Sequence, residues 1–359
     1  MEMLVQKVVA PGGETSWTVV DERFEPVEPV EVYLAHLEAI ERSPNTLRAY
    51  ASSLRLFFDF LEGRGVAWEE VRLEEVGRFV SWLRRPTAEV VVPIDSAPAR
   101  ATTTVNRHLA AVFGLYEFHA RRGLSVASEL VDWRRGGRGS YKPFLEGVGG
   151  RSRKSPRRPV RLRTPRRLPE TLSPEQITSL LAACEHLRDR LLVALIAETG
   201  MRIGQALGLR HSDVVSRDKT IRIVPRSGNA NGARAKCRDE ATIPVSAALV
   251  RLYSEYLFDE CGDIDSDYVF VNLFAAPIGR PLRYSAVTGL VGRLRARTGI
   301  EFSLHLLRHS AASEWIRSGV PIEVVSKLLT HANVTTTSGT YVHLGVEDLR
   351  AELEKAGLR

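Results

Sequence analysis

The chain has 359 residues, of which 44% are hydrophobic and 26% are charged, a composition typical of a globular protein with two or three domains. Its longest apolar run, LLVALIA at residues 191–197, is far shorter than the roughly 20 residues that span a bilayer, which excludes a membrane helix. Fifty Lys and Arg residues against 43 Asp and Glu residues give a formal net charge of +7.

The cysteines and the N-terminus limit the chemistry and the location. Cys184, Cys237 and Cys261 are widely spaced and odd in number, so they support neither a disulfide framework nor a paired metal site. The start, MEMLVQKVVAPGG, lacks the basic residues, the long apolar stretch and the cleavage site of a secretory signal. We therefore expect reduced cysteines, no metal and a cytoplasmic protein.

The first third of the chain is expected to be a short strand pair followed by a helical domain. Alternation in MLVQKVV, a turn at APGGE and a returning WTVV predict two strands within residues 1–28. Over residues 29–125 apolar side chains recur at helical spacing, and SPNTLRAY offers a capped helix start. The segments LEEVGRFVSWLRR and TTTVNRHLAAVFGLYEFHARRG predict further helices of the same domain.

A basic linker, rich in Arg, Pro and Gly, is expected over residues 126–168. From Arg151 to Arg167 nine of seventeen residues are basic and none is acidic, which exceeds the whole net charge of the chain. Repulsion between these charges and the missing N–H groups of proline predict an extended segment. It is either a solvated tether or a strap along a phosphate backbone, and the sequence pI of about 9.5 favours the strap.

Residues 169–345 are expected to form a second domain, mainly α with a small antiparallel β-sheet. LSPEQITSLLAAC has an N-terminal capping pattern, and RLLVALIAETGMRIGQALGLRHSDV predicts a buried helix, a glycine turn and a shorter helix. TIRIVP at 220–225 and ATIPV at 241–245 predict two strands joined by a polar span. The rest is expected to be helical apart from YVFVNLF at 268–274.

Two arginines, two histidines and a tyrosine of this second domain have unusual positions. In HLLRHSAASEWIRSG, His305 and Arg308 are three residues apart at a helix start, so they share a face and can address one anion. Arg202 follows a glycine turn and precedes an apolar helix, where a long cation either points into a cleft or is an ordinary surface arginine. His331 ends a helix, and Tyr341 lies in a polar, threonine-rich segment that offers an aromatic ring little to pack against.

These groups suit an attack on a phosphodiester. Guanidinium groups match the paired non-bridging oxygens of a phosphate and keep their charge at any relevant pH. They would stabilise the charge that develops on phosphorus, a contact worth about 3 to 4 kcal/mol per donor. A tyrosine hydroxyl, with a pKa of about 10, becomes a nucleophile when neighbouring groups make its proton easy to lose.

The same segments carry a family resemblance. ETGMRIGQALGLRHSDV and HLLRHSAASEWIRSGVPIEVVSKLLTHANVTTTSGTY resemble the two conserved boxes of the tyrosine recombinases, the phage integrase family. SPNTLRAYASSLRLFFDFL is similar to the helical core-binding, SAM-like domain of that family, and PRSGNANGARAKCRDEATIPV most resembles its transposon-encoded integrases. The resemblance implies a two-domain fold, with a core-binding domain over residues 29–125 and a catalytic domain over residues 169–345.

The resemblance also implies roles for the matching residues. Tyr341 would attack a phosphate of double-stranded DNA and form a 3′-phosphotyrosyl link, which keeps the phosphodiester energy so that resealing requires no cofactor and no metal. Arg202 and Arg308 would clamp the phosphate, His305 would take or position the proton of the nucleophile, and His331 would hydrogen-bond a phosphate oxygen. The protein would act as a homo-oligomer on DNA, a dimer to tetramer, at the bacterial nucleoid.

A lysine in the family protonates the leaving 5′-oxygen, which an arginine cannot do because it does not release its proton. Between residues 169 and 300 the chain has only Lys219 and Lys236. Lys219 lies in the turn before the first strand, whereas Lys236 lies in the loop between the two strands and matches the family position better. Lys236 is therefore the predicted acid, with charge neutralisation of nearby DNA as its plainer role.

Two further features concern the cleft and the tail. Many relatives have an acid three residues after the first arginine, where this chain has Gln205, an amide that hydrogen-bonds without charge. This departure affects the fine geometry of the cleft rather than the reaction. In the tail, residues 346–359, apolar side chains at helical spacing predict a last helix, which either folds onto its own domain or, as in the family, docks on a neighbouring protomer.

Three rival interpretations remain open on sequence. IEVVSKLLTHANVTTTSGTY fits a helix-turn-helix of a DNA-binding regulator, which leaves Arg202, Lys236 and His305 without a role. A type IB topoisomerase uses similar chemistry, and relaxation of a supercoiled plasmid that lacks a target site would favour it. A hydrolase with Ser310 and His309 is disfavoured, because adjacent helix residues point apart.

Overall fold

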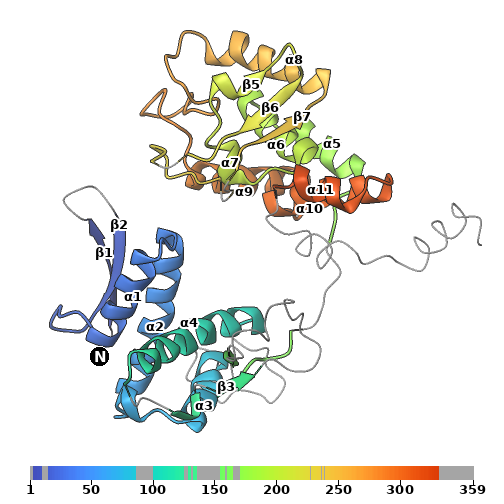
Figure 1. The fold of residues 1–359 in the computed structure, drawn as a ribbon. Helices are drawn as coiled ribbons and strands as arrows, with labels where there is room; N and C mark the ends of the chain where they lie inside the picture. Colours follow the sequence, from blue (N-terminus) through green and yellow to red (C-terminus); the bar gives the residue numbers. More distant parts are fainter. Residues whose placement is uncertain are drawn as a thin grey trace, which may run out of the picture. The chain divides into compact units, whose positions relative to one another are not determined.

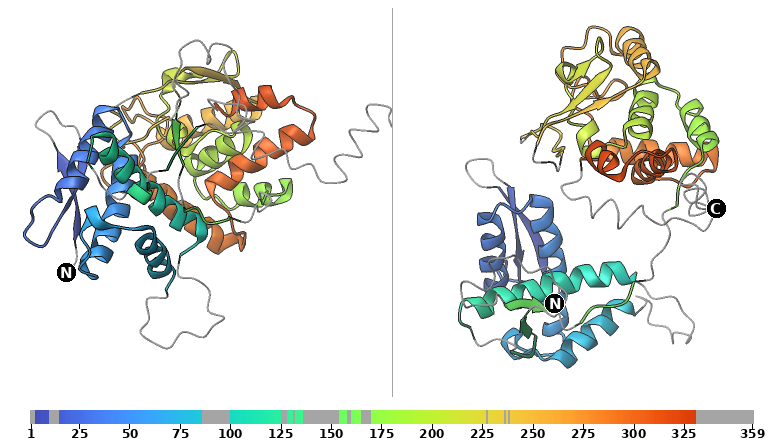
Figure 2. Two further views of the ribbon diagram at one scale, coloured as in Figure 1. Left: turned by 60° about the horizontal axis from the view of Figure 1, so that its bottom comes forward. Right: turned by 45° about the vertical axis from the view of Figure 1, so that its right-hand side comes forward.

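The chain divides into two compact units in the computed structural model, residues 1–166 and residues 167–359. The described residues are 3–9, 15–85, 100–124, 128–130, 132–135, 154–157, 160–164, 170–226, 228–235, 237 and 239–330. Figure 1 shows the described elements in chain order, and Figure 2 shows them from two further directions.

The first unit combines small antiparallel strand pairs with a helical bundle. A hairpin of β1 (Leu4–Val9) and β2 (Thr15–Val20) packs against the first two helices. The elements that follow are α1 (Glu28–Ala39), α2 (Pro44–Glu62), the short η1 (Trp68–Glu70), α3 (Leu73–Arg84), α4 (Thr102–Arg121), η2 (Ser128–Leu130), β3 (Asp132–Arg135) and β4 (Lys154–Arg157). Strands β3 and β4 form a second antiparallel pair.

Local capping and an aromatic core explain the bundle. The Ser43 hydroxyl accepts a hydrogen bond of 3.2 Å from the backbone N–H of Thr46, and Pro44 occupies the first turn of α2, where a missing N–H costs nothing. The ring of Phe57 in α2 lies 5.0 Å from that of Phe79 in α3 and 6.2 Å from that of Tyr116 in α4, measured between centroids. These edge contacts join the three helices in one core.

Part of the basic stretch lies against α4. The Asn106 side chain donates to the carbonyl of Leu162 and accepts from its N–H, both at 2.9 Å. Val160 and Leu162 pack against the core of the first unit, whereas Arg161 and Arg163 between and after them are exposed. The chain is therefore fixed here with two arginines facing solvent.

The second unit is mainly helical around one small sheet. Its elements are α5 (Pro174–Ala182), α6 (Leu187–Thr199), α7 (Ile203–Ala206), η3 (His211–Asp213), β5 (Val214–Val215), β6 (Thr220–Ile223), β7 (Ala241–Pro244), α8 (Ala247–Glu255), a π-helical turn η4 (Tyr256–Cys261), α9 (Tyr284–Thr298), α10 (Leu304–Arg317) and α11 (Ile322–Leu328). The sheet has the antiparallel order β5-β6-β7, with Ile221 opposite Ile243. The predicted fold class, mainly α with a small antiparallel sheet, is confirmed, and β5 is a strand that the sequence pattern did not predict.

Helix α6 organises the second unit. Leu191, Leu192, Leu195 and Ile196 are buried, and α5, α8 and α10 all pack against the helix. Gly200 ends α6 with a left-handed conformation, φ +60°, and a Cβ atom at this position would lie 2.9 Å from the Leu329 side chain. Glycine is thus required both for the turn and for the close approach of α11.

None of the helices among the described residues is both long enough and apolar enough to cross a bilayer. Residues 268–274, the segment not expected to be helical, form isolated bridges instead of a strand: Tyr268 pairs with Arg210, and Val271 pairs with Pro281. These bridges hold the loop before α9 against the body of the unit.

Candidate active site

Arg202 lies where the ends of three helices meet. It is the residue before α7, and its backbone N–H donates to the Gln205 side-chain oxygen at 2.7 Å. Its guanidinium Nη1 donates to the Thr330 hydroxyl at 3.1 Å and lies 3.4 Å from the carbonyl oxygens of Leu329 and Thr330. The glycine turn at the end of α6 therefore aims Arg202 at the end of α11.

Arg308 reaches the same place from the second turn of α10. Only 2% of Arg308 is exposed. Its Nη1 donates to the carbonyl of Gly200 at 2.6 Å, and its Nη2 donates to the carbonyl of Leu329 at 2.8 Å. Because Arg202 also contacts the Leu329 carbonyl, the structure brings the two predicted arginines together at one oxygen atom.

His305 lies one turn before Arg308 on α10. It is exposed at the surface, but part of its ring lies against protein atoms, and this partial burial lowers the pKa of the imidazole below 6.5. The charges of Arg308 and Arg202 lower the pKa further. The ring of His309 lies 4.3 Å from that of His305, and burial lowers its pKa to about 4. Near neutral pH His305 is therefore an uncharged imidazole that can accept a proton.

The hydroxyl of Ser310 serves the fold. It donates to the carbonyl of Leu306 at 2.9 Å and accepts from the N–H of Leu172 at 2.8 Å. Ser310 is also buried, with 4% exposure. These contacts oppose the hydrolase interpretation, in which this hydroxyl would be the nucleophile.

The loop between β6 and β7 is packed directly on α7. A Cβ atom on Gly204 would lie 2.3 Å from the carbonyl oxygen of Arg234, so only glycine allows this approach. Further along the loop, the sulfur of Cys237 lies 3.9 Å from the amide nitrogen of Gln205. Described residues on either side of Lys236 thus contact the helix that follows Arg202.

Three of the predicted site residues, Lys236, His331 and Tyr341, lie outside the described residues. Thr330, the residue that precedes His331 in the sequence, hydrogen-bonds both Arg202 and Gln205. The competing lysine, Lys219, is in the turn before β6, with φ +51°, at the opposite end of that strand from the loop that contacts α7.

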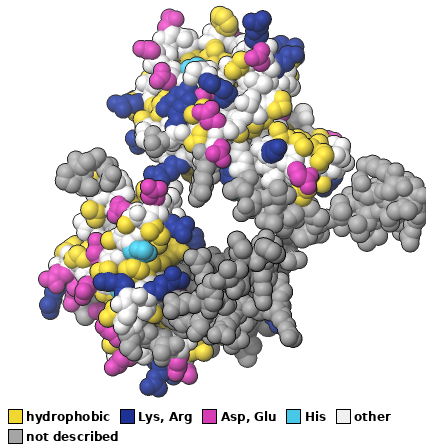
Figure 3. Space-filling model, viewed as in Figure 1, with side chains coloured by type: hydrophobic (Ala, Val, Ile, Leu, Met, Phe, Trp, Pro, Cys, Tyr) yellow, Lys and Arg dark blue, Asp and Glu magenta, His cyan; other side chains and the backbone are white. Residues whose placement is uncertain are grey.

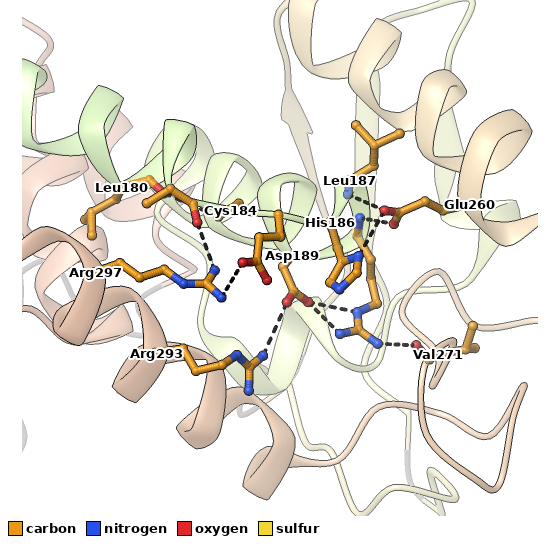
Figure 4. Close-up of polar contacts among 12 residues, drawn as sticks. Leu180, Cys184, His186, Leu187, Asp189, Glu260, Val271, Arg293 and Arg297 are labelled. Atoms are coloured by element: carbon orange, nitrogen blue, oxygen red, sulfur yellow. Dashed lines mark hydrogen bonds and ion pairs between the residues drawn. The ribbon is translucent and has the colours of Figure 1, made fainter.

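A separate pocket of about 390 Å³ was not predicted from the sequence. It lies at the N-terminal end of α6, where Asp189 accepts hydrogen bonds from Arg188 at 2.7 and 2.9 Å and pairs with Arg293 at 3.5 Å. Figure 4 shows Asp189 facing Arg293, with Arg297 beside it. Because α6 rises about 1.5 Å per residue, this network is roughly 15 to 20 Å from the Gly200 turn. It supports the fold at the far end of the helix.

The described surface carries both signs of charge. Figure 3 shows Lys and Arg side chains gathered on the visible face of the second unit, with Asp and Glu side chains beside them. Among the described residues no group of three His, Cys, Asp or Glu side chains is placed to hold a metal ion.

Comparison with known proteins identifies the class to which this fold and these arginines belong. The phage integrase family matches residues 170–347, and the N-terminal SAM-like domain of phage integrases matches residues 30–123. The chain belongs to the phage integrase family, whose members are the tyrosine recombinases.

Two relatives and one solved structure illustrate this family assignment. Transposase A from transposon Tn554 of Staphylococcus aureus is 38% identical over 342 residues, which is 94% of this chain and 93% of the relative. Tyrosine recombinase XerD of Corynebacterium glutamicum is 28% identical, covering 89% of this chain and 94% of the relative. The fold is similar to that of the Tn1549 transposon integrase in complex with transposon right end DNA, with a TM-score of 0.64 and 15% identity over 92% of this chain and 99% of that one.

Proposed function

We propose that the protein is a site-specific recombinase that cuts and rejoins duplex DNA through a phosphotyrosine on Tyr341. The phenol oxygen of Tyr341 bonds to phosphorus while the bond from phosphorus to the bridging 5′-oxygen breaks. The phenol proton passes to His305, and the leaving 5′-oxygen takes a proton from Lys236. The new ester is a phosphodiester, so a second 5′-hydroxyl can reverse the step and join a different strand.

The observation that carries the proposal is the meeting of Arg202 and Arg308 at the Leu329 carbonyl. Two guanidinium groups from different helices form a site for a doubly coordinated phosphate, and neither loses its charge near neutral pH. His305 lies one turn away, and because its pKa is lowered the imidazole is uncharged near neutral pH and can accept a proton. His331 follows Thr330 in the sequence and is proposed to hydrogen-bond a phosphate oxygen.

The domains are proposed to have the same separate functions as in the family. Residues 29–125 bind the core DNA site, residues 126–168 link the domains, and residues 169–345 carry the chemistry. The partner is duplex DNA, supported by the family membership and by the positive net charge of +7. We propose that a homo-oligomer of two to four chains assembles on DNA at the nucleoid.

The test is a covalent adduct that survives SDS. Nicked duplexes that tile the DNA on both sides of the protein's own gene are incubated with the full chain, since a nick beside the cleaved phosphate lets the short strand diffuse away and traps the intermediate. We expect an adduct with one duplex, its loss in Tyr341→Phe, and retained DNA binding by this variant. Tyr284→Phe is the matched control, because Tyr284 is a surface tyrosine with 62% exposure at the start of α9. An adduct that persists in Tyr341→Phe refutes the proposal.

A further inference from the structure

The side chain of Asn231, in the loop between β6 and β7, hydrogen-bonds three backbone groups, two outside this loop and one within it. Its amide nitrogen donates to the carbonyl of Leu207 at 2.9 Å and to the carbonyl of Leu282 at 3.0 Å. Its amide oxygen accepts from the N–H of Ala233 at 3.0 Å. Both amide hydrogens and the oxygen are thus engaged, and the partners belong to the end of α7, the loop before α9 and the same β6–β7 loop.

Neighbouring residues add independent attachments. The oxygen of Asn229 accepts from Arg210 at 3.0 Å, and its amide nitrogen donates to the carbonyl of Ala233 at 2.8 Å. The hydroxyl of Tyr268 accepts from the N–H of Ala230 at 2.9 Å, while the Arg210 guanidinium lies 3.2 Å from the centre of the Tyr268 ring. The loop is therefore held by side chains along residues 229–233.

The element to which Asn231 is attached is the one that positions Arg202. Leu207 is the C-terminal cap of α7, and Arg202 is its N-terminal cap. Past Asn231 the chain passes Arg234, whose carbonyl lies against Gly204 in the same helix, before it reaches Lys236. One short helix thus fixes the arginine at its start and the loop at its end.

We propose that Asn231 is a positioning residue for protonation of the leaving 5′-oxygen. By holding residues 231–235 on α7, it sets the distance between Arg202 and the point where the chain continues to the proton donor, which the proposed function assigns to Lys236. The described part of the loop, up to residue 235, is thus attached to the helix that begins after Arg202. This inference rests on the proposed function and adds Asn231 to its machinery.

The expected effect of replacing Asn231 follows from the role of the general acid that it positions. A correctly placed general acid contributes about 10²- to 10⁴-fold, and a misplacement of about 1 Å costs roughly 10²-fold. Asn231→Ala should therefore lower cleavage of an ordinary phosphodiester about 100-fold. With a sulfur in place of the bridging 5′-oxygen, the leaving thiolate requires no proton, and the same variant should cleave nearly as fast as the unaltered chain.

The experiment measures single-turnover adduct formation by the full chain on the nicked duplex that forms the adduct, with a 5′-oxygen or a 5′-bridging sulfur. The matched control is Asn272→Ala, since Asn272 donates one hydrogen bond of 3.3 Å to Pro277 in an exposed loop of the same unit. A milder variant, Tyr268→Phe, removes the hydroxyl that contacts Ala230 and Asn229 and should give a smaller loss with the same sulfur rescue. Lys236→Ala removes the proposed proton donor, so its rates on the two substrates are the reference with which those of Asn231→Ala are compared.

Two results would overturn the inference. An equal loss on both substrates would mean that Asn231 supports the whole site, and an unchanged rate on the ordinary substrate would mean that the loop needs no attachment. Tyr268→Phe keeps the inference testable if Asn231→Ala does not fold. Failure of the unaltered chain to form any Tyr341-dependent adduct, on either substrate, would instead refute the proposed function.

Discussion

Arg161 and Arg163 provide a quantitative test of DNA contact by the first unit. Both are exposed, while Val160 and Leu162 pack inward and Asn106 binds both backbone groups of Leu162. Because the backbone is already fixed, these arginines can contact neighbouring phosphates without first ordering the chain. We predict that Arg161→Ala/Arg163→Ala weakens DNA binding mainly at low salt.

The magnitude follows from counterion release. Each phosphate contact contributes about 0.9 to the slope of log K against log salt concentration, so two lost contacts should reduce the slope by about 1.8. Over a rise from about 50 to about 200 mM salt, the unaltered chain should then lose roughly 12-fold more affinity than the variant. Fluorescence anisotropy with a labelled duplex of arbitrary sequence measures both slopes.

The control removes the same formal charge from another part of the first unit. Arg64 and Arg78 both pair with Glu75, so Arg64→Ala/Arg78→Ala lowers the net charge equally while removing cations that already have a carboxylate partner. Its slope should remain close to that of the unaltered chain. An unchanged slope in the first variant, or an equal change in the control, would refute a specific phosphate contact.

Three further predictions concern stability and the site. Burial of His108 lowers its pKa to about 4, so the unfolded chain binds the proton more tightly, and acidification from pH 7 to pH 5 should cost about 2 kcal/mol of stability, measured by urea unfolding. Asp189→Asn leaves Arg188, with 8% exposure, without its main counter-charge and should cost about 3 to 5 kcal/mol in the same assay. Gly204→Ala places a methyl group 2.3 Å from the Arg234 carbonyl and should cost about 1 to 3 kcal/mol and reduce adduct formation.

Each of the three predictions has its own control variant. His108→Gln should flatten the acid dependence, and an equally steep profile in that variant would assign it to other groups. Replacement of the Arg188–Asp189 pair by Met and Leu should cost less than Asp189→Asn, and the opposite order would contradict the charge argument. Gly289→Ala, where the nearest atom to the added Cβ is 3.6 Å away, should be harmless; if it behaves like Gly204→Ala, the close approach to Arg234 is not the cause.

The elements with local signals could be predicted from the sequence. Helix α5 begins at a Ser173–Pro174 pattern whose capping bonds involve only Ser173 and Gln176, three residues apart. Strand β5 has two residues and exists because it pairs with β6, which no local pattern records. Arg202 and Arg308 share the carbonyl of Leu329, which is 127 residues from Arg202. No local pattern records a contact over that distance, so the prediction that the two arginines lie together depended on the family motifs.

Asn231 shows why the rest could not be predicted. It lies in a polar, glycine-rich span where asparagine is an ordinary turn residue. Its partners Leu207 and Leu282 are 24 and 51 residues away, and both contribute backbone carbonyls, which carry no side-chain signature. Only the tertiary structure distinguishes this asparagine from Asn272, whose side chain donates a single hydrogen bond to Pro277.

Position 205 of this chain is an amide, and backbone carbonyls supply the negative partial charge beside Arg308. Gly200 and Leu329, whose carbonyls accept from Arg308, are the C-terminal caps of α6 and α11. Carbonyls at helix C-termini lack intrahelical partners and carry partial negative charge, so they stabilise a buried guanidinium. An uncharged amide then suffices at Gln205, whose oxygen holds the backbone of Arg202 and whose nitrogen donates to Thr330 at 2.8 Å. The amide donates to the Thr330 hydroxyl, whereas a carboxylate at this position could only accept from that hydroxyl; in this chain the amide links the start of α7 to the end of α11 with the hydroxyl as acceptor.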